Sequence, residues 1–137
     1  MENIYIRGIA GAVIGLASYF FGALDALLTA LLAMMAIDFA TGIIKAVVFK
    51  ELDSRKMSLG GARKVGIMLV VAVSNVIDGI LELGGLLRTV TISYFIANEG
   101  ISLLENWSLM GLPVPVKLRN VLAQLRGNDD APGDKEV

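Results

Sequence analysis

Residues 26–49 read ALLTALLAMMAIDFATGIIKAVVF, and this stretch decides the fold class. Asp38 and Lys45 are its charged residues, and apolar side chains occupy most of the other positions. A helix needs about 20 such residues to cross the hydrocarbon core of a bilayer. The whole chain follows the pattern: 55% of its 137 residues are hydrophobic, 18% are charged, and its mean hydropathy is +0.71. Soluble domains carry about 25% charged residues, so the sequence predicts an integral membrane protein.

Three further apolar segments flank this stretch, at residues 8–22, 65–83 and 86–104, and the last of them is the weakest. The break at residues 23–25 is so short that we expect a tight helical hairpin, with an uncleaved membrane helix rather than a signal peptide at the N-terminus. Residues 50–64 are predicted to form a polar loop with Gly-Gly as a flexible joint. The predicted fold is therefore all-α, with helical hairpins and four short transmembrane helices. Three crossings remain the alternative, with one weak segment lying in the interface.

The C-terminal part of the chain is predicted to lie outside the bilayer. Residues 1–107 form the transmembrane helical domain, and residues 108–126 form a Pro-bounded turn followed by a cytoplasmic amphipathic helix. Residues 127–137 are rich in Asp and Glu and are predicted to be a disordered acidic tail.

Basic residues predict the orientation, because they gather on the cytoplasmic side of membrane proteins. The segment 50–64 is the richest in them, so it is expected to face the cytoplasm, with both termini on the same side of a multi-pass protein. The residues of this topology loop are Lys50, Arg55, Lys56, Arg63 and Lys64.

Polar residues recur at helical spacing within the apolar segments, which predicts one polar stripe per helix. Charges in hydrocarbon are costly and call for a partner, a cavity or a pore. The stripes either pack against each other within one bundle or line water in an oligomer, and both readings stay open. Asp38 and Asp78 are expected at similar depth near mid-membrane, and Lys45–Glu99 and Glu82–Arg88 are expected to pair. The candidate pore and stripe residues are Asp38, Thr41, Lys45, Asn75, Asp78, Glu82, Asn98, Glu99, Ser102 and Glu105.

Small residues predict a packing face on the first helix. Gly11 and Gly15 form a G-x-x-x-G motif, which lets helices approach closely in lipid. Self-association and intramolecular packing within the first hairpin account for this face equally well. The predicted packing residues are Gly8, Gly11, Gly15 and Gly22.

The composition argues against catalysis. The chain has no cysteine and no histidine, which excludes disulfides, thiol chemistry and His-based triads. The buried carboxylates have no nucleophile or Gly-rich phosphate loop beside them. We therefore expect no catalytic, metal or cofactor site and no enzyme activity, and the net charge of −1 argues against nucleic acid as a partner.

Several strings resemble the toxin-secretion and phage-lysis holin family. They are Asp38-x-x-Thr41-Gly42, Lys50-x-Leu52-x-Ser54 and Gly61-x-Arg63-Lys64, followed by NEGISLLEN at 98–106 and GLPVP at 111–115. The resemblance covers residues 25–125, and its last two strings are the most specific.

This resemblance implies a protein that acts by assembly. A holin oligomerises in the bacterial inner (cytoplasmic) membrane and opens lesions that release an endolysin or, in toxin loci, a large toxin, and so leads to host cell lysis. The implied partners are membrane lipid, further copies of the chain, an endolysin or secreted toxin, and an antiholin. The alternatives are that the chain is itself an antiholin or a small transporter or channel subunit.

Overall fold

The computed structural model describes residues 2–127, and these residues form five helices without a strand. The predicted all-α membrane fold is thereby confirmed. In chain order the helices are α1 (Glu2–Phe21), α2 (Ala26–Val48), α3 (Ser54–Ile80), α4 (Leu86–Leu109) and α5 (Val116–Leu125). The predicted tail lies outside the described residues, apart from Gly127.

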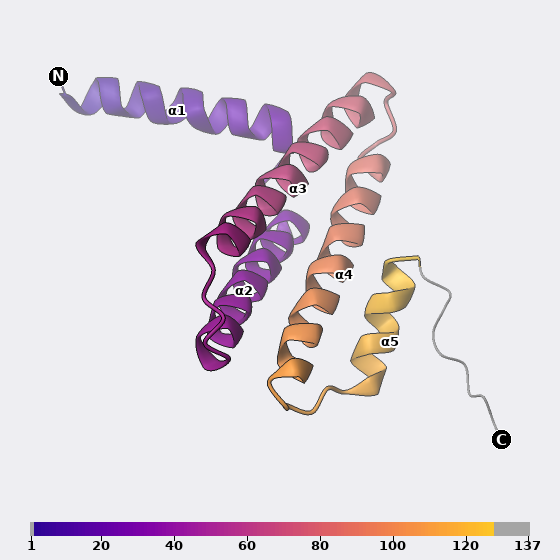
Figure 1. Ribbon diagram of the computed structural model, residues 1–137. Helices are drawn as coiled ribbons and strands as arrows, with labels where there is room; N and C mark the ends of the chain where they lie inside the picture. Colours follow the sequence, from indigo (N-terminus) through magenta and orange to yellow (C-terminus); the bar gives the residue numbers. More distant parts are fainter. Residues whose placement is uncertain (1, 128–137) are drawn as a thin grey trace.

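Helices α2, α3 and α4 form the body of the molecule. They lie side by side and alternate in direction, so that the α2–α3 and α4–α5 turns share one end (Figure 1). The most extensive packing is between α2 and α4, with α3 against both. Apolar side chains that recur at helical spacing fill the space between the three helices. The core residues are Leu28, Leu31, Met35, Ile67, Val71 and Ile92.

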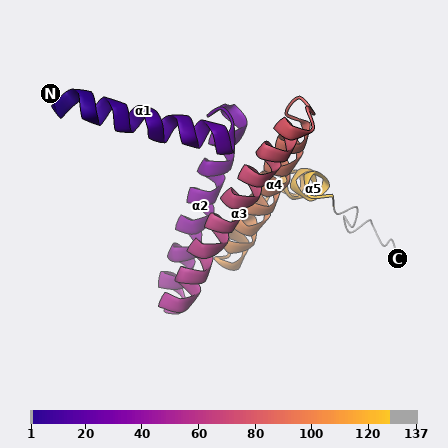
Figure 2. The same cartoon turned by 90° about the horizontal axis from the view of Figure 1, so that it is seen from above.

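Helix α1 projects away from this bundle at a steep angle in both views (Figures 1 and 2). It contacts α3 at its C-terminal end, and residues 3–20 are exposed throughout. The expected hairpin between the first two segments is therefore wrong, because α1 does not fold back along α2. The physical reason lies in the connection, where Gly22 adopts a φ of +75° and Asn75 of α3 donates a hydrogen bond to the Tyr19 carbonyl at 3.0 Å.

Helix α3 begins much earlier than the apolar pattern predicts. Asp53 is its N-cap, and the Asp53 carboxylate accepts a hydrogen bond from the Arg55 backbone N–H at 2.8 Å. The predicted loop over 50–64 is therefore wrong from residue 54 onward: Gly60 and Gly61 are helical, and four of the five basic residues belong to the first turns of α3.

Three helices are long and apolar enough to cross a membrane, in the ranges Asn3–Phe21, Ala26–Val48 and Ser54–Ile80. Helix α4 spans 24 residues but is not among them, and it carries Arg88, Glu99 and Glu105. The fourth crossing accordingly stays a prediction.

Helix α5 is the predicted amphipathic helix. It follows Pro115 and doubles back along α4 (Figure 1). Its buried residue, Leu122, sits against Gly100 of α4, where a Cβ would come within 3.0 Å of a Leu122 methyl group. A glycine at this position therefore allows α5 to pack on α4.

Candidate functional site: two buried polar clusters

A charge cluster joins the three bundle helices about halfway along α2 and α4. The Lys64 ammonium donates hydrogen bonds to Asp38 Oδ2, at 2.8 Å, and to the Glu99 carboxylate. The three side chains are mostly buried, with exposed fractions of 16% for Lys64, 12% for Asp38 and 6% for Glu99. One cation from α3 thus holds a carboxylate from α2 and another from α4.

An amide extends the cluster by about two helical turns toward the α2–α3 connection. Asn106 donates to Asp38 Oδ1 at 3.3 Å and accepts from Lys45 Nζ at 2.8 Å. The expected pair of Lys45 with Glu99 is therefore wrong. Lys64 belongs to a helix instead of a loop, so it reaches Glu99 and leaves Lys45 to the amide.

A second cluster, the Arg88 clasp, lies at the end of the bundle where α3 meets α4. The Arg88 guanidinium bonds both carboxylate oxygens of Asp25, at 2.7 and 3.3 Å, and donates at 2.9 Å to the carbonyls of Phe21 and Ala23. These donors match the fork geometry of an arginine, which can hold several acceptors at once. The expected Glu82–Arg88 pair is wrong, because Glu82 lies exposed in the α3–α4 turn with a φ of +52°. The clasp ties the α1–α2 connection to the start of α4.

Asp78 completes the clasp from α3. Its carboxylate accepts the backbone N–H groups of Gly85, at 2.7 Å, and of Arg88, at 2.9 Å. A carboxylate in this position satisfies unpaired donors of the first turn of α4 and complements the helix dipole.

The pKa of the Asp25 carboxyl group is held below its ordinary value of 3.8. The hydrogen bond from the Arg88 guanidinium lowers it most, and the hydrogen bond from the Leu28 backbone N–H lowers it further.

The two clusters lie at opposite ends of an apolar core. The clusters are about 20 Å apart along the helices. The rise per residue gives this distance both from Lys64 to Asp78 on α3 and from Asp25 to Asp38 on α2. The expectation that Asp38 and Asp78 share one depth is therefore wrong, because they belong to different clusters. The early start of α3 shifts its register against α2, and this shift separates the two carboxylates.

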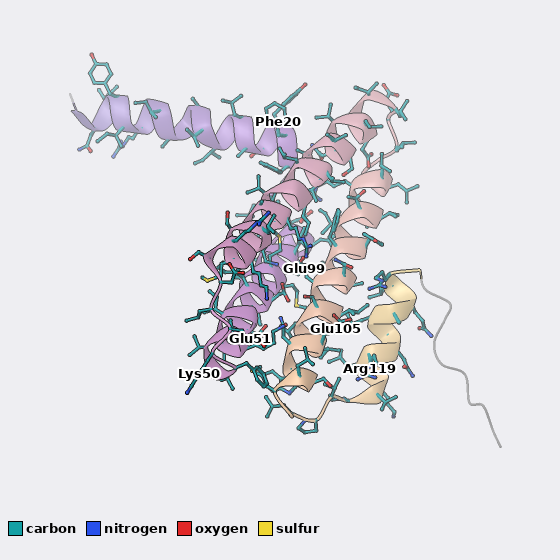
Figure 3. The ribbon with its side chains drawn as sticks, viewed as in Figure 1. Phe20, Lys50, Glu51, Glu99, Glu105 and Arg119 are labelled. Carbon is teal, nitrogen blue, oxygen red and sulfur yellow. The ribbon has the colours of Figure 1, made fainter. Side chains whose placement is uncertain are left out.

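The remaining stripe residues fall into two groups. Thr41 is buried and donates to the Asp38 carbonyl at 2.9 Å, while Asn98 and Ser102 are half-buried. Glu105 is exposed and lines a groove between α4 and α5 together with Arg119 (Figure 3). The predicted stripes therefore divide into side chains inside the bundle and side chains on its surface.

The predicted packing glycines also divide. A Cβ added to Gly8, Gly11 or Gly15 would meet nothing within 4 Å, so this face of α1 has no partner among residues 2–127. Gly22 differs: a Cβ there would come within 2.7 Å of Arg88 Nε. Gly22 is thus part of the Arg88 clasp.

Sequence reasoning missed Asp25 and Asn106 as site residues and paired Arg88 with Glu82. A signal existed on α4, where Glu99 and Asn106 are seven residues apart and so share a face. On α3, Lys64, Val71 and Asp78 repeat the same spacing across the predicted loop boundary.

Chemically, the clusters fasten helices to one another. In each cluster, carboxylates face a cation, which is the arrangement that makes buried charges tolerable in a low dielectric. No buried side-chain donor or acceptor within residues 2–127 lacks a hydrogen-bond partner. Among the same residues, no group of acidic side chains is placed to hold a metal ion.

Comparison with known proteins matches the bacteriophage holin family to residues 15–127. A probable holin of Bacillus phage phi105 is 39% identical over 119 residues, which cover 87% of this chain and 87% of the relative. An uncharacterized protein of Clostridium acetobutylicum is 40% identical over 112 residues, covering 81% of this chain and 90% of the relative. An uncharacterized 14.9 kDa protein from the nagH 3′ region of Clostridium perfringens is 42% identical over 130 residues, covering 91% and 97%. No solved structure matches the chain.

Proposed function

Because the chain belongs to the bacteriophage holin family, we propose that it oligomerises in the bacterial cytoplasmic membrane and opens lesions that lead to lysis. The lesions give an endolysin, or in a toxin locus a large toxin, access to the cell wall. The observation that carries the proposal is the exposure of α1. A helix that is exposed over residues 3–20 and has no charged residue from Gly8 to Phe20 requires lipid or other protein around it.

The free glycine face of α1 supports contact between copies. Apolar helices gain little hydrophobic energy from each other in lipid, so their association depends on close van der Waals packing between small residues. Gly8, Gly11 and Gly15 offer such a surface, and no other described part of the chain covers it. Association of this kind rises with protein concentration by mass action, as timed assembly requires.

The two groups of stripe residues take different parts in this proposal. Exposed Glu82 and Glu105 are available to line water without any rearrangement. Inside the bundle, Lys64 neutralises Asp38 and Glu99, and Lys45 binds the Asn106 amide, so these side chains face water after the bundle opens.

The proposed orientation places the shared end of the α2–α3 and α4–α5 turns in the cytoplasm. This end carries most of the basic residues of both connections, in agreement with the positive-inside tendency. With α4 as a crossing helix, both termini are then cytoplasmic. The basic residues at this end are Lys50, Arg55, Lys56, Arg63, Lys64, Lys117 and Arg119.

The test is induced expression in bacteria together with an endolysin that lacks a leader, with culture density and membrane potential followed over time. We expect abrupt depolarisation after a delay, and lysis that depends on the endolysin. The variant Gly11→Leu/Gly15→Leu keeps α1 apolar but blocks close approach, so lysis should be delayed or lost. Val13→Leu/Ile14→Leu on the same helix is the matched control and should lyse normally. An inserted protein that leaves membrane potential and growth unchanged would refute the proposal and favour an antiholin or a transporter subunit.

A further inference from the structure

Helix α5 buries only part of its apolar surface against α4. Leu122 is buried, whereas about half of the surface of Leu118, Val121 and Leu125 is exposed. The four residues fall within an arc of about 100° when successive residues are placed 100° apart around the helix. The exposed three therefore form one apolar stripe beside the contact with α4.

Basic residues border the arc of four apolar residues on both sides. Lys117 lies next to Val121 around the helix, and Arg119 lies next to Leu122 on the opposite edge, each within about 60° of the apolar arc. Long basic side chains at such borders can rest their methylene groups on apolar surface while the charge reaches lipid headgroups. Neither Lys117 nor Arg119 forms an ion pair within residues 2–127.

The charge carried by α5 and its two flanking turns is basic. From Asn106 to Gly127 the charged residues are Lys117, Arg119 and Arg126, and the acidic neighbour on α4 is Glu105, which lines the α4–α5 groove with Arg119. Trp107, Leu109 and Leu112, at the corner between α4 and α5, are exposed as well. An amphipathic helix with basic borders beside exposed aromatic and apolar side chains is the composition of a segment that lies in the membrane interface.

We propose that the exposed face of α5 docks on the surface of an anionic lipid bilayer, with Leu118, Val121 and Leu125 among the acyl chains and Lys117 and Arg119 on the lipid phosphates. Leu122 remains seated on Gly100, so α5 connects α4 to the headgroup layer. This inference rests on the insertion of the chain into a membrane. It does not depend on whether the chain opens lesions.

The absence of cysteine from the sequence allows a direct test with one introduced label. The full chain carrying Val121→Cys is spin-labelled and reconstituted into vesicles of phosphatidylcholine, with or without phosphatidylglycerol. Collision with oxygen and with a water-soluble nickel chelate reports whether the label contacts lipid or water. Asn120→Cys, one residue away on the polar side, is the matched control.

The Val121 label should contact lipid in vesicles that contain phosphatidylglycerol and water in those that do not, while the Asn120 label contacts water in both. The variant Lys117→Gln/Arg119→Gln should shift the equilibrium toward water about 25-fold, or about fivefold for each basic residue. High salt should act in the same direction.

Two results would overturn the inference. A Val121 label that contacts water in both lipids shows that α5 does not dock. A label that contacts lipid regardless of phosphatidylglycerol and of the double substitution shows apolar burial without recognition of anionic lipid. Release of an encapsulated dye, measured on the same vesicles, reports separately on lesion formation, so failure of either proposal is distinguishable.

Discussion

Replacing Lys64 by methionine should destabilise the bundle strongly, because Lys64 is the cation of the charge cluster. The substitution leaves the carboxylates of Asp38 and Glu99 without it, at side-chain exposures of 12% and 6%. Removing one partner of a buried ion pair costs about 3–5 kcal/mol. Asn106 still donates to Asp38 after the change, so we expect the lower end, a loss of about 3 kcal/mol in the free energy of unfolding.

The assay is unfolding of the purified chain in detergent micelles by titration with sodium dodecyl sulfate, followed by far-ultraviolet circular dichroism. Arg63→Met is the matched control, because Arg63 is an exposed cation on the adjacent residue. Its effect should stay within about 0.5 kcal/mol. The triple variant Lys64→Met/Asp38→Asn/Glu99→Gln should regain most of the lost stability, since no charge is then left unpaired. Equal stability of Lys64→Met and Arg63→Met would refute the reasoning.

Three further predictions concern the Arg88 clasp. Gly22→Ala should lower the free energy of unfolding by about 2 kcal/mol in the same titration, because Gly22 has a φ of +75° and a Cβ there would meet Arg88 Nε at 2.7 Å. Gly15→Ala, where a Cβ meets nothing within 4 Å, should be neutral. Equal losses of stability in the two variants would contradict this account. Asp78→Ala should cost about 1–2 kcal/mol by removing the acceptor at the N-terminus of α4, and fraying of that turn, seen as faster hydrogen exchange, should accompany it. The pKa of Asp25 in the folded state lies below 3.8. Its contribution to the free energy of unfolding is therefore fully present above pH 3.8, and it is lost as the pH falls through the folded-state pKa. The stability difference between wild type and Asp25→Asn should therefore be constant near neutral pH and shrink below about pH 3.8, and a difference that grows in acid would contradict the assignment.

The sequence was sufficient to predict α2 and the all-helical class, because residues 26–49 are long and apolar enough for one structure only. The start of α3 was not predictable from hydropathy, because residues 54–64 contain four basic residues, and one of them, Lys64, is mostly buried. Asp53 as an N-cap was the available local signal. The direction of α1 depends on hydrogen bonds from Asn75 and Arg88 to backbone carbonyls, and such bonds leave no periodic trace in a sequence.

The candidate site, too, was predictable from the sequence only in part. Asp38 and Glu99 were predicted as polar intramembrane residues from their spacing, and they do meet in one cluster. Their partner was assigned wrongly because Lys64 was placed in a loop, which left Lys45 as the nearest cation for Glu99. Pairing across helices depends on register, and register follows from where each helix starts.

The central claim is that this chain makes openings large enough for a folded enzyme, and purified protein in liposomes tests it most directly. Vesicles are loaded with a small dye and with a labelled protein of endolysin size, and release of both is followed as the protein-to-lipid ratio rises. The account predicts that dye and protein are released together above a threshold ratio. Release of the dye alone, or of neither, at every ratio with correctly inserted protein would contradict it.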